Sequence, residues 1–451
     1  MTEAALPFPS GFVWGSATAS YQVEGAVDTD GRGRSIWDTF CDVPGAILNG
    51  DTGAVACDQY HRYPEDVALM ASLGLGAYRF SVAWPRIQPD GRGAPNQKGL
   101  DHYRRLVSTL LENGITPYVT LYHWDLPQAL QDRGGWPERD TAYRFADYAE
   151  IVHDALGDVV EHWITLNEPK VSSHAGYGSG IHAPGIRDLA QRDRAAHHLL
   201  LAHGLGVQRL RAAGARQVGI TLDLSPVDPA SPAEEDVAAA RRVDADSHGL
   251  FLEPILTGAY PAGVMDPSVV AAGDFDLIGA PLDFLGVNYY RRMLVRAAPS
   301  GHLRAETVLP SGTPVTSVGW PVQPEGFRDL LVGLSARYPG LPPIYITENG
   351  AAFPDAVGAD GQVHDPLRVD YLHRHLLALR SAIEAGVDVR GYFVWTLIDN
   401  FEWAEGFSAR FGIVYVDHTD QSRVPKSSAT WYGRVARSNA VPPPLRADVG
   451  N

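Results

Sequence analysis

The chain contains 451 residues, 45% of them hydrophobic, and carries a formal net charge of −16 from 37 basic and 53 acidic residues. This length allows a large buried core, and the acidic balance argues against nucleic acid or an anionic membrane as a partner. The first residues have neither the basic nor the apolar segment of a secretory signal, and no run reaches the roughly 18 apolar residues of a membrane span. We therefore expect a cytoplasmic protein. Its two cysteines, Cys41 and Cys57, are too few for a disulfide framework.

Short apolar runs, rich in β-branched and aromatic residues, alternate with longer helical patterns along the chain. Runs of this composition and length are typical of buried strands. The predicted strands are Gly11–Ala17, Ala77–Ala83, Thr116–Tyr122, His162–Asn167, Val218–Leu222, Phe284–Tyr289, Pro343–Thr347 and Gly391–Leu397. The predicted helices are Pro64–Leu73, Leu100–Asn113, Thr141–Leu156, Arg192–Ala213, Pro232–Gly249, Glu325–Arg337 and Pro366–Ala385.

Alternation of strand and helix implies a parallel sheet, and eight repeats imply a closed barrel. The predicted fold class is α/β, a single (β/α)8 TIM barrel that forms one domain over residues 1–451. Three segments rich in Pro, Gly, Ser or acidic residues are predicted as long surface loops: Leu224–Asp236, Ala297–Pro314 and Pro354–Asp365. The Pro-rich segment Val441–Asn451 is predicted to be a flexible tail.

Two glutamates, Glu168 and Glu348, each follow a predicted strand at the point where a Pro or an Asn-Gly turn ends it. A parallel barrel brings the carboxyl ends of its strands to one face, where active sites lie. Two carboxylates on that face are the groups that cleave a glycosidic bond. Either glutamate alone could equally well cap a helix, so the pair needs support from the rest of the chain.

Other strand ends carry amides, acids and indoles. Carboxylates and amides hydrogen-bond hydroxyl groups, and aromatic faces stack on the apolar side of a sugar ring. A single Trp is more often part of the core. Three Trp residues beside acids at predicted strand ends, Trp124, Trp395 and Trp403, favour a sugar site.

Seven stretches in order along the chain resemble glycoside hydrolase family 1, the β-glucosidase family. They are FPSGFVWGSATASYQVEGA (Phe8–Ala26), YRFSVAWPRIQP (Tyr78–Pro89), TLYHWDLPQAL (Thr120–Leu130), TLNEP (Thr165–Pro169), GVNYY (Gly286–Tyr290), ITENG (Ile346–Gly350) and WTLIDNFEWAEGF (Trp395–Phe407). The resemblance implies a single (β/α)8 barrel that hydrolyses β-glycosides with retention of configuration, without a metal or an organic cofactor.

The resemblance also assigns roles at the matching positions. Glu348 would be the nucleophile, and Glu168 the general acid and then the general base. A nucleophile must stay ionised, and Arg79 and Tyr290 are candidates for the groups that stabilise its charge. The acid needs a raised pKa, and a retaining enzyme needs its two carboxyls roughly 5–5.5 Å apart.

Ten residues are predicted to bind the substrate: Gln22, His123, Trp124, Asn167, Asn288, Trp320, Trp395, Glu402, Trp403 and Phe411. By the resemblance, Asn167 would face the 2-hydroxyl and Trp395 would lie under the ring. Glu402 suits neutral 4- and 6-hydroxyls and would repel a 6-phosphate. The family's phospho-glycosidases have a Lys and a Tyr shortly after this position, and Ser408–Phe411 contains neither. We therefore expect an unphosphorylated sugar.

The chain departs from the family on the leaving-group (aglycone) side. Many members have Trp where this chain has Lys170, and an aromatic residue where it has Gln323. Each lost stacking contact weakens a flat aglycone by roughly 1 kcal/mol. An altered leaving-group preference follows, unless Lys170 is only a solvated charge at the rim.

Several alternatives remain open at this point. His197, His198, His203, His373 and His375 lack carboxylate or Cys partners at ligand spacing, so surface or interface histidines are favoured over a metal site. A catalytically silent glycan-binding protein is disfavoured because both glutamates are present. A transglycosylating enzyme would use the same residues. The choice among glucose, galactose and fucose, the natural aglycone, and a monomeric or homo-oligomeric state are also open.

Overall fold

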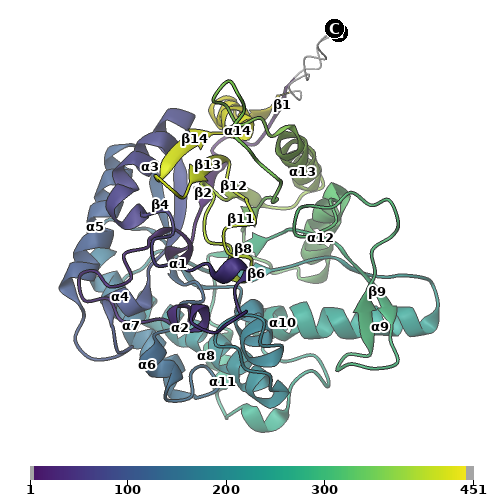
Figure 1. The fold of residues 1–451 in the computed structure, drawn as a ribbon. Coiled ribbons are helices and arrows are strands. Elements are labelled where there is room, and N and C mark those ends of the chain that lie inside the picture. Colours follow the sequence, from purple (N-terminus) through teal and green to yellow (C-terminus); the bar gives the residue numbers. More distant parts are fainter. Residues whose placement is uncertain (1–4, 443–451) are drawn as a thin grey trace.

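Eight parallel strands form a closed barrel in the computed structural model, which describes residues 5–442 (Figure 1). The strands are β2 (Val13–Ala17), β3 (Ala77–Ser81), β4 (Thr116–Tyr122), β5 (His162–Asn167), β6 (Gln217–Asp223), β8 (Phe284–Asn288), β11 (Ile344–Asn349) and β12 (Val389–Trp395). Each strand pairs with the next in this order, and β12 pairs with β2 to close the barrel. All eight predicted strands, and the predicted barrel, are confirmed.

Long helices surround the barrel in Figure 1. They are α3 (Gln59–Leu73), α5 (Gln97–Glu112), α7 (Asp140–Leu156), α8 (Leu189–Ala212), α9 (Glu234–Asp244), α10 (Leu250–Thr257), α12 (Pro324–Arg337), α13 (Pro366–Glu384) and α14 (Ser427–Ser438). The apolar stripe of α5 is buried at Leu106, Val107 and Leu110, as its spacing requires. None of the helices in the described residues is long and apolar enough to cross a membrane.

Two helix predictions need correction. The first predicted helix begins at Pro64, but α3 begins earlier, at Gln59, and contains Pro64. The predicted helix Pro232–Gly249 is observed as α9 followed by a π-helical segment, Ala245–Gly249. The helical conformation does not end at Gly249, because α10 follows directly. The sequence analysis also missed α14, whose Trp431, Tyr432 and Val435 are fully buried.

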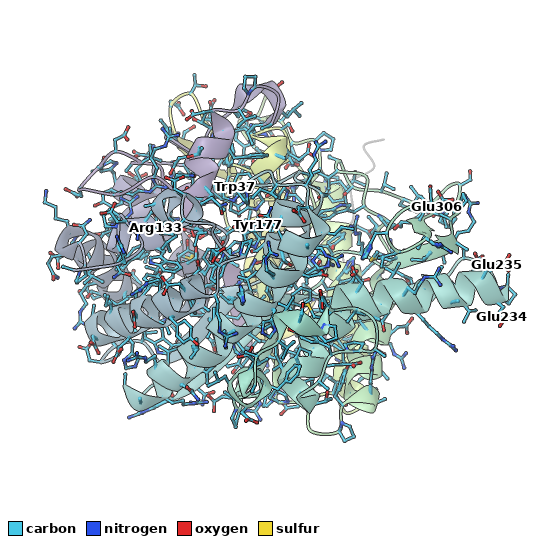
Figure 2. All side chains as sticks on the ribbon, turned by 90° about the horizontal axis from the view of Figure 1, so that it is seen from below. Trp37, Arg133, Tyr177, Glu234, Glu235 and Glu306 are labelled. Atoms are coloured by element: carbon cyan, nitrogen blue, oxygen red, sulfur yellow. The ribbon has the colours of Figure 1, made fainter. Side chains whose placement is uncertain are left out.

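A small sheet lies partly in two segments that were predicted as loops, Leu224–Asp236 and Ala297–Pro314. Its strands are β7 (Val227–Pro229), β9 (Met293–Ala297) and β10 (Ala305–Thr307). It packs on α9 through a small core of its own, formed by Ala239, Ala240, Val243 and Val295. Figure 2 shows this unit extending beyond the barrel, with Glu234 and Glu235 at the end of α9. The strands are short and mostly half-exposed, so they lack the apolar runs that mark the barrel strands.

The start of the predicted tail is part of the fold. β15 (Ala440–Val441) pairs with β1 (Leu6–Pro7), and Val441 is buried. Residues 443–451 of the predicted tail lie outside the described residues.

The prediction of surface histidines is wrong for His197, His198, His203 and His375, which are all buried. Each ring has a hydrogen-bond partner: His197 contacts Asp274, His198 contacts the carbonyl oxygen of Trp136, His203 contacts Thr165, and His375 contacts the carbonyl oxygen of Tyr371. Burial lowers the pKa of these rings and favours the neutral form. They are hydrogen-bonded core residues.

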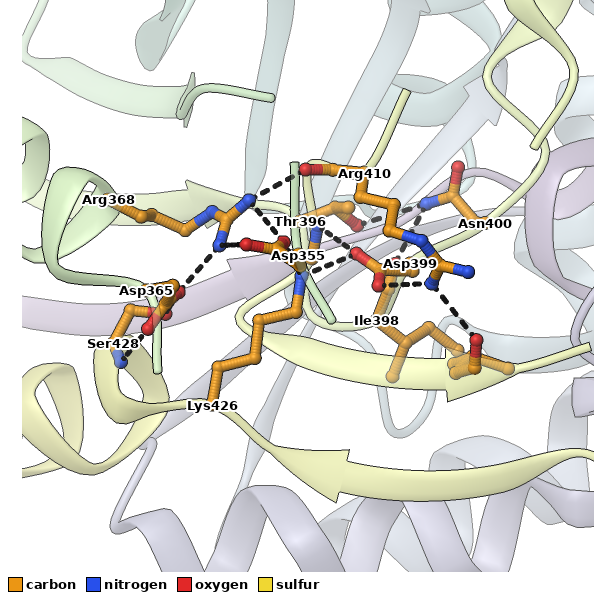
Figure 3. Close-up of polar contacts among 12 residues, drawn as sticks. Asp355, Asp365, Arg368, Thr396, Ile398, Asp399, Asn400, Arg410, Lys426 and Ser428 are labelled. Carbon is orange, nitrogen blue, oxygen red and sulfur yellow. Dashed lines mark hydrogen bonds and ion pairs between the residues drawn. The ribbon is translucent and has the colours of Figure 1, made fainter. Parts of the chain in front are cut away.

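A buried network of charges holds the segment that follows β12 (Figure 3). Its members are Asp355, Asp365, Arg368, Asp399, Arg410 and Lys426. The Lys426 ammonium lies 2.5 Å from Asp355 and 2.8 Å from Asp399, and its side chain is fully buried. Asp399 also accepts a hydrogen bond of 2.9 Å from the backbone N–H of Gly412. The network therefore fixes both ends of the segment between residues 399 and 412, which carries Glu402 and Trp403.

Lys426→Met tests the contribution of this network to stability. The variant leaves two buried aspartates without their shared cation, and breaking a buried pair in this way costs about 3–5 kcal/mol. We expect a matching loss in the free energy of unfolding, measured by urea denaturation. Lys98→Met is the control, because the Lys98 side chain is 70% exposed and pairs with Asp30 at the surface. Equal stabilities of the two variants would contradict the assigned role.

Candidate active site

Glu348, in β11, lies between two donors. Arg79 of β3 donates from Nη1 to Oε1 of Glu348 at 2.6 Å, and the Tyr290 hydroxyl donates to Oε2 at 2.5 Å. The Arg79 and Glu348 side chains are 0% and 4% exposed. Burial raises the pKa of Glu348, and the Arg79 charge and the Tyr290 hydroxyl oppose this rise. The contacts with Arg79 and Tyr290 favour the ionised form of Glu348.

Glu168 follows β5 directly and has a different environment. Its carboxylate accepts a hydrogen bond of 2.6 Å from the side-chain amide of Asn288 and has no ion pair among the described residues. Burial, followed by the negative charge of Glu348, raises the pKa of Glu168 well above its ordinary value. The environments of the two carboxyls therefore differ in the way that an acid and an anion require. Glu168 retains a proton more readily than Glu348.

Asn167 joins the surroundings of the two carboxyls. Its Oδ1 accepts from Arg79 at 2.6 Å and from Asn288 at 3.1 Å, and its Nδ2 lies 3.0 Å from Nε2 of His123. Asn288 is held in turn by the Thr347 hydroxyl at 2.7 Å. A chain of hydrogen bonds thus connects Arg79, beside Glu348, through Asn167 to Asn288, beside Glu168. The carboxyl ends of β3, β5, β8 and β11 are fixed relative to one another.

A cavity of about 770 Å³ opens at this face of the barrel. Ten predicted site residues line it: His123, Trp124, Glu168, Tyr290, Trp320, Glu348, Trp395, Glu402, Trp403 and Phe411. The other four, Gln22, Arg79, Asn167 and Asn288, are fully buried and reach the cavity wall through hydrogen bonds. The structure therefore brings the whole predicted set together. A volume of this size suits a small molecule of one or a few rings.

Aromatic rings form much of the inner wall. The rings of Trp124 and Trp403 have centroids 4.6 Å apart, and the ring of Trp395 lies parallel to His123 at 5.9 Å. Trp124, Glu168 and Trp403 adopt φ values of 78°, 48° and 51°, in the left-handed region that side chains other than Gly rarely occupy. Such strain is concentrated at functional sites.

Glu402 lies in the inner part of the cavity. Gln22 donates to its Oε2 at 3.2 Å, and burial raises the pKa of Glu402 to about 8. A raised pKa favours the protonated carboxyl, which can both donate and accept hydrogen bonds. This property suits neutral hydroxyls.

Another part of the cavity wall consists of residues that were not predicted from the sequence. Asp223 and Arg291 line it, together with His174, Asp246, His302 and Leu303. Asp223 ends β6, and the strand-end signal that identified the other residues also applies to it. Lys170 pairs with Asp223 at 2.6 Å and is 19% exposed, so it is not a free charge at the rim. Gln323 does not line the cavity; its carbonyl oxygen accepts from Tyr289.

A closed parallel barrel with two unlike buried carboxyls at one end defines the class of the protein: a (β/α)8-barrel glycoside hydrolase. The model of Glycosyl hydrolase family 1 matches residues 4–441. A thermostable β-glucosidase B from Thermobispora bispora is 53% identical over 97% of this chain and 92% of that protein. The family 1 β-glucosidase structure from Thermotoga maritima has a TM-score of 0.94 and 47% identity, over 97% of this chain and 99% of that one. A bifunctional β-D-glucosidase/β-D-fucosidase from Bifidobacterium breve is 48% identical over 95% of this chain and 97% of that protein. The chain belongs to glycosyl hydrolase family 1.

Tyr290→Phe tests the environment of Glu348. The variant removes a donor that lowers the pKa of Glu348, so this pKa rises and the acid limb of the kcat/KM profile moves to higher pH. A hydrogen bond to a charged group contributes about 1.5–3 kcal/mol, so kcat/KM is expected to fall by roughly 10- to 100-fold. The matched control is Tyr289→Phe, because the Tyr289 hydroxyl donates to a backbone carbonyl outside the site. An unmoved acid limb in Tyr290→Phe would show that this hydroxyl does not stabilise the anion.

Proposed function

We propose that the protein is a retaining, exo-acting β-glycosidase that removes terminal, unphosphorylated β-D-glycosyl residues, with glucose as the principal sugar. The observation that carries the proposal is the contrast between the two carboxyls. Glu348 has a cation and a hydroxyl donor, whereas Glu168 has one neutral amide and the repulsion of Glu348. This division gives one nucleophile and one proton donor.

In the first step, a carboxylate oxygen of Glu348 attacks the anomeric carbon. The bond from that carbon to the leaving oxygen breaks, and Glu168 gives its proton to the departing oxygen. Arg79 and Tyr290 hold Glu348 in place through its two oxygens. The products of this step are a glycosyl ester on Glu348 and an ionised Glu168.

In the second step, the charges are reversed. The ester on Glu348 is neutral, so the repulsion that added to the effect of burial on the pKa of Glu168 is gone, and this pKa falls. The Asn288 amide donates to that carboxylate. Glu168 then takes a proton from water as the water oxygen bonds to the anomeric carbon and Glu348 leaves. An alcohol or sugar in place of water would give transglycosylation by the same route.

The inner cavity supports recognition of a single sugar. Oε1 of Gln22 and Nδ1 of His123 are buried and have no hydrogen-bond partner among the described residues, so they are available to sugar hydroxyls. Trp395 offers an aromatic face beside Glu402 and Glu348. The relative from Bifidobacterium breve carries fucosidase activity in its name, and we propose β-fucosidase and β-galactosidase as secondary activities.

The charges around Glu402 support a sugar without a 6-phosphate. A phosphate needs cations, and the cavity-lining residues that adjoin Glu402 in sequence are Trp403, Ala404 and the acidic Glu405. Arg410 is engaged by Asp399. The described cavity residues that adjoin Glu402 in sequence therefore offer an anionic sugar no cation.

Glu348→Gln and Glu168→Gln test the two roles. With p-nitrophenyl β-D-glucoside, we expect turnover by the wild type and a loss of roughly four orders of magnitude in Glu348→Gln, since the nucleophile is lost. Glu168→Gln should lose far less on dinitrophenyl β-D-glucoside, because that leaving group departs without a proton. Both effects are measured as initial rates of release of the nitrophenol or dinitrophenol leaving group. A strong preference for a 6-phosphoglucoside would refute the proposed sugar, and no turnover of any β-glycoside would favour a glycan-binding protein.

The aglycone site supports a second prediction. Lys170 and Asp223 place an ion pair on the wall where many relatives have an indole, so the wall offers hydrogen bonds in place of a stacking face. We expect Lys170→Trp to raise kcat/KM for aryl β-glucosides relative to disaccharides by about fivefold, which corresponds to roughly 1 kcal/mol for one stacking contact. The ranking of aryl, alkyl and disaccharide substrates measures the effect. An unchanged ranking would exclude Lys170 from leaving-group selection.

A further inference from the structure

Two opposite charges lie beside the proposed proton donor. Lys170 follows Glu168 in the chain after a single proline. Asp223 ends β6, the strand whose Thr221 carbonyl oxygen accepts from the backbone N–H of Glu168 at 2.9 Å. The Lys170 ammonium contacts Oδ2 of Asp223 at 2.6 Å, and the two side chains are 19% and 20% exposed. Both residues line the same cavity wall as Glu168.

Each member of this pair acts on Glu168 with the opposite sign. The Asp223 charge raises the pKa of Glu168 and the Lys170 charge lowers it, in addition to the larger effects of burial and of Glu348. The remaining groups that face Glu168 are the amide of Asn288 and the hydroxyl of Tyr290. His248 and Arg291 act on Asp223. Besides Glu348, Asp223 and Lys170 are the charged groups with the largest effects on the pKa of Glu168.

We propose that Lys170 and Asp223 form a positioning pair of balanced charges, which lets Glu168 hold a proton at the start of the first step of the reaction and be ionised at the start of the second. This inference rests on the proposed role of Glu168 and adds two residues to it. Lys170 alone would favour the ionised carboxylate and deplete the protonated form that must be present before the first step. Asp223 alone would hold the proton on Glu168 and oppose the ionised form that Glu168 must have before it takes a proton from water. Paired at 2.6 Å, the two charges largely cancel at Glu168.

The pair also explains why a lysine is tolerated beside an acid that must stay protonated. A single cation next to a carboxyl lowers the pKa of that carboxyl. Here Asp223 accepts a hydrogen bond from the Lys170 ammonium. The cation therefore adds a hydrogen-bonding group to the cavity wall without ionising Glu168. Lys170 and Asp223 are thus expected to be required together.

The test measures kcat/KM against pH for Lys170→Met, Asp223→Asn and the double variant, with p-nitrophenyl β-D-glucoside. The basic limb reports the loss of the proton from the coupled pair Glu168 and Glu348. We expect it to move up by roughly 0.5 to 1 pH unit in Lys170→Met and down by a similar amount in Asp223→Asn. The double variant should return close to the wild type.

Controls separate this inference from its alternatives. Lys98→Met removes the charge of a surface lysine and should leave the profile unmoved. Lys170→Gln removes the same charge as Lys170→Met with a polar side chain, and it replaces that variant if the latter does not fold. With dinitrophenyl β-D-glucoside, the shifts of the basic limb should shrink in first-step rates, because departure needs no proton.

Two results would overturn the inference: unmoved basic limbs in both single variants, or shifts of the same sign in both. Either result, with normal turnover by the wild type and loss of activity in Glu348→Gln, would leave the proposed function intact. Absence of wild-type turnover on every β-glycoside would instead refute the proposed function, and with it the inference.

Discussion

The buried ion pair between Arg79 and Glu348 is the constraint on which the active end of the barrel depends. The guanidinium of Arg79 has no access to solvent and contacts Glu348, the Thr347 carbonyl oxygen, Asn167 and Thr120. One side chain thus joins β3, β4, β5 and β11. A buried charge without its partner is strongly destabilising, so Glu348 must stay in contact with Arg79. The strands that carry these two residues must therefore keep their register.

The same pair sets the character of the second carboxyl. Glu348 is kept negative by its donors, and its charge then repels a negative charge on Glu168. The difference between acid and nucleophile therefore follows from the direct contacts of the two carboxyls. Glu348 is bonded to a cation, and Glu168 is bonded to an amide.

The barrel and the inner site could be predicted from the sequence because their signals are local. Buried strands are apolar runs, and residues at strand ends meet at one face whatever the loops between them do. Asp223 carries the same signal and was overlooked, although it ends a predicted strand. The positive φ values of Trp124, Glu168 and Trp403 have no sequence signal, because residues of these types rarely adopt them.

Features that depend on tertiary contacts could not be predicted. The buried histidines are hydrophilic by type, and only their partners in the fold, such as Asp274 for His197, make burial favourable. The pairing of Lys170 with Asp223 joins residues from two strand ends, and neither motif indicates the other. The strands β7, β9 and β10 are too short and too exposed for a periodic signal.

The enzyme has two parts that tolerate changes in sequence to different degrees: the barrel, and the projecting unit formed by α9 and the small sheet. His302 and Leu303, between β9 and β10, and Ala305, at the start of β10, line the cavity, while the unit packs around its own core. Changes of length or sequence in this hairpin can therefore reshape the entrance without disturbing the strands that hold the carboxyls. In evolutionary terms, the range of leaving groups can diversify at this hairpin while the bond-breaking chemistry stays constant.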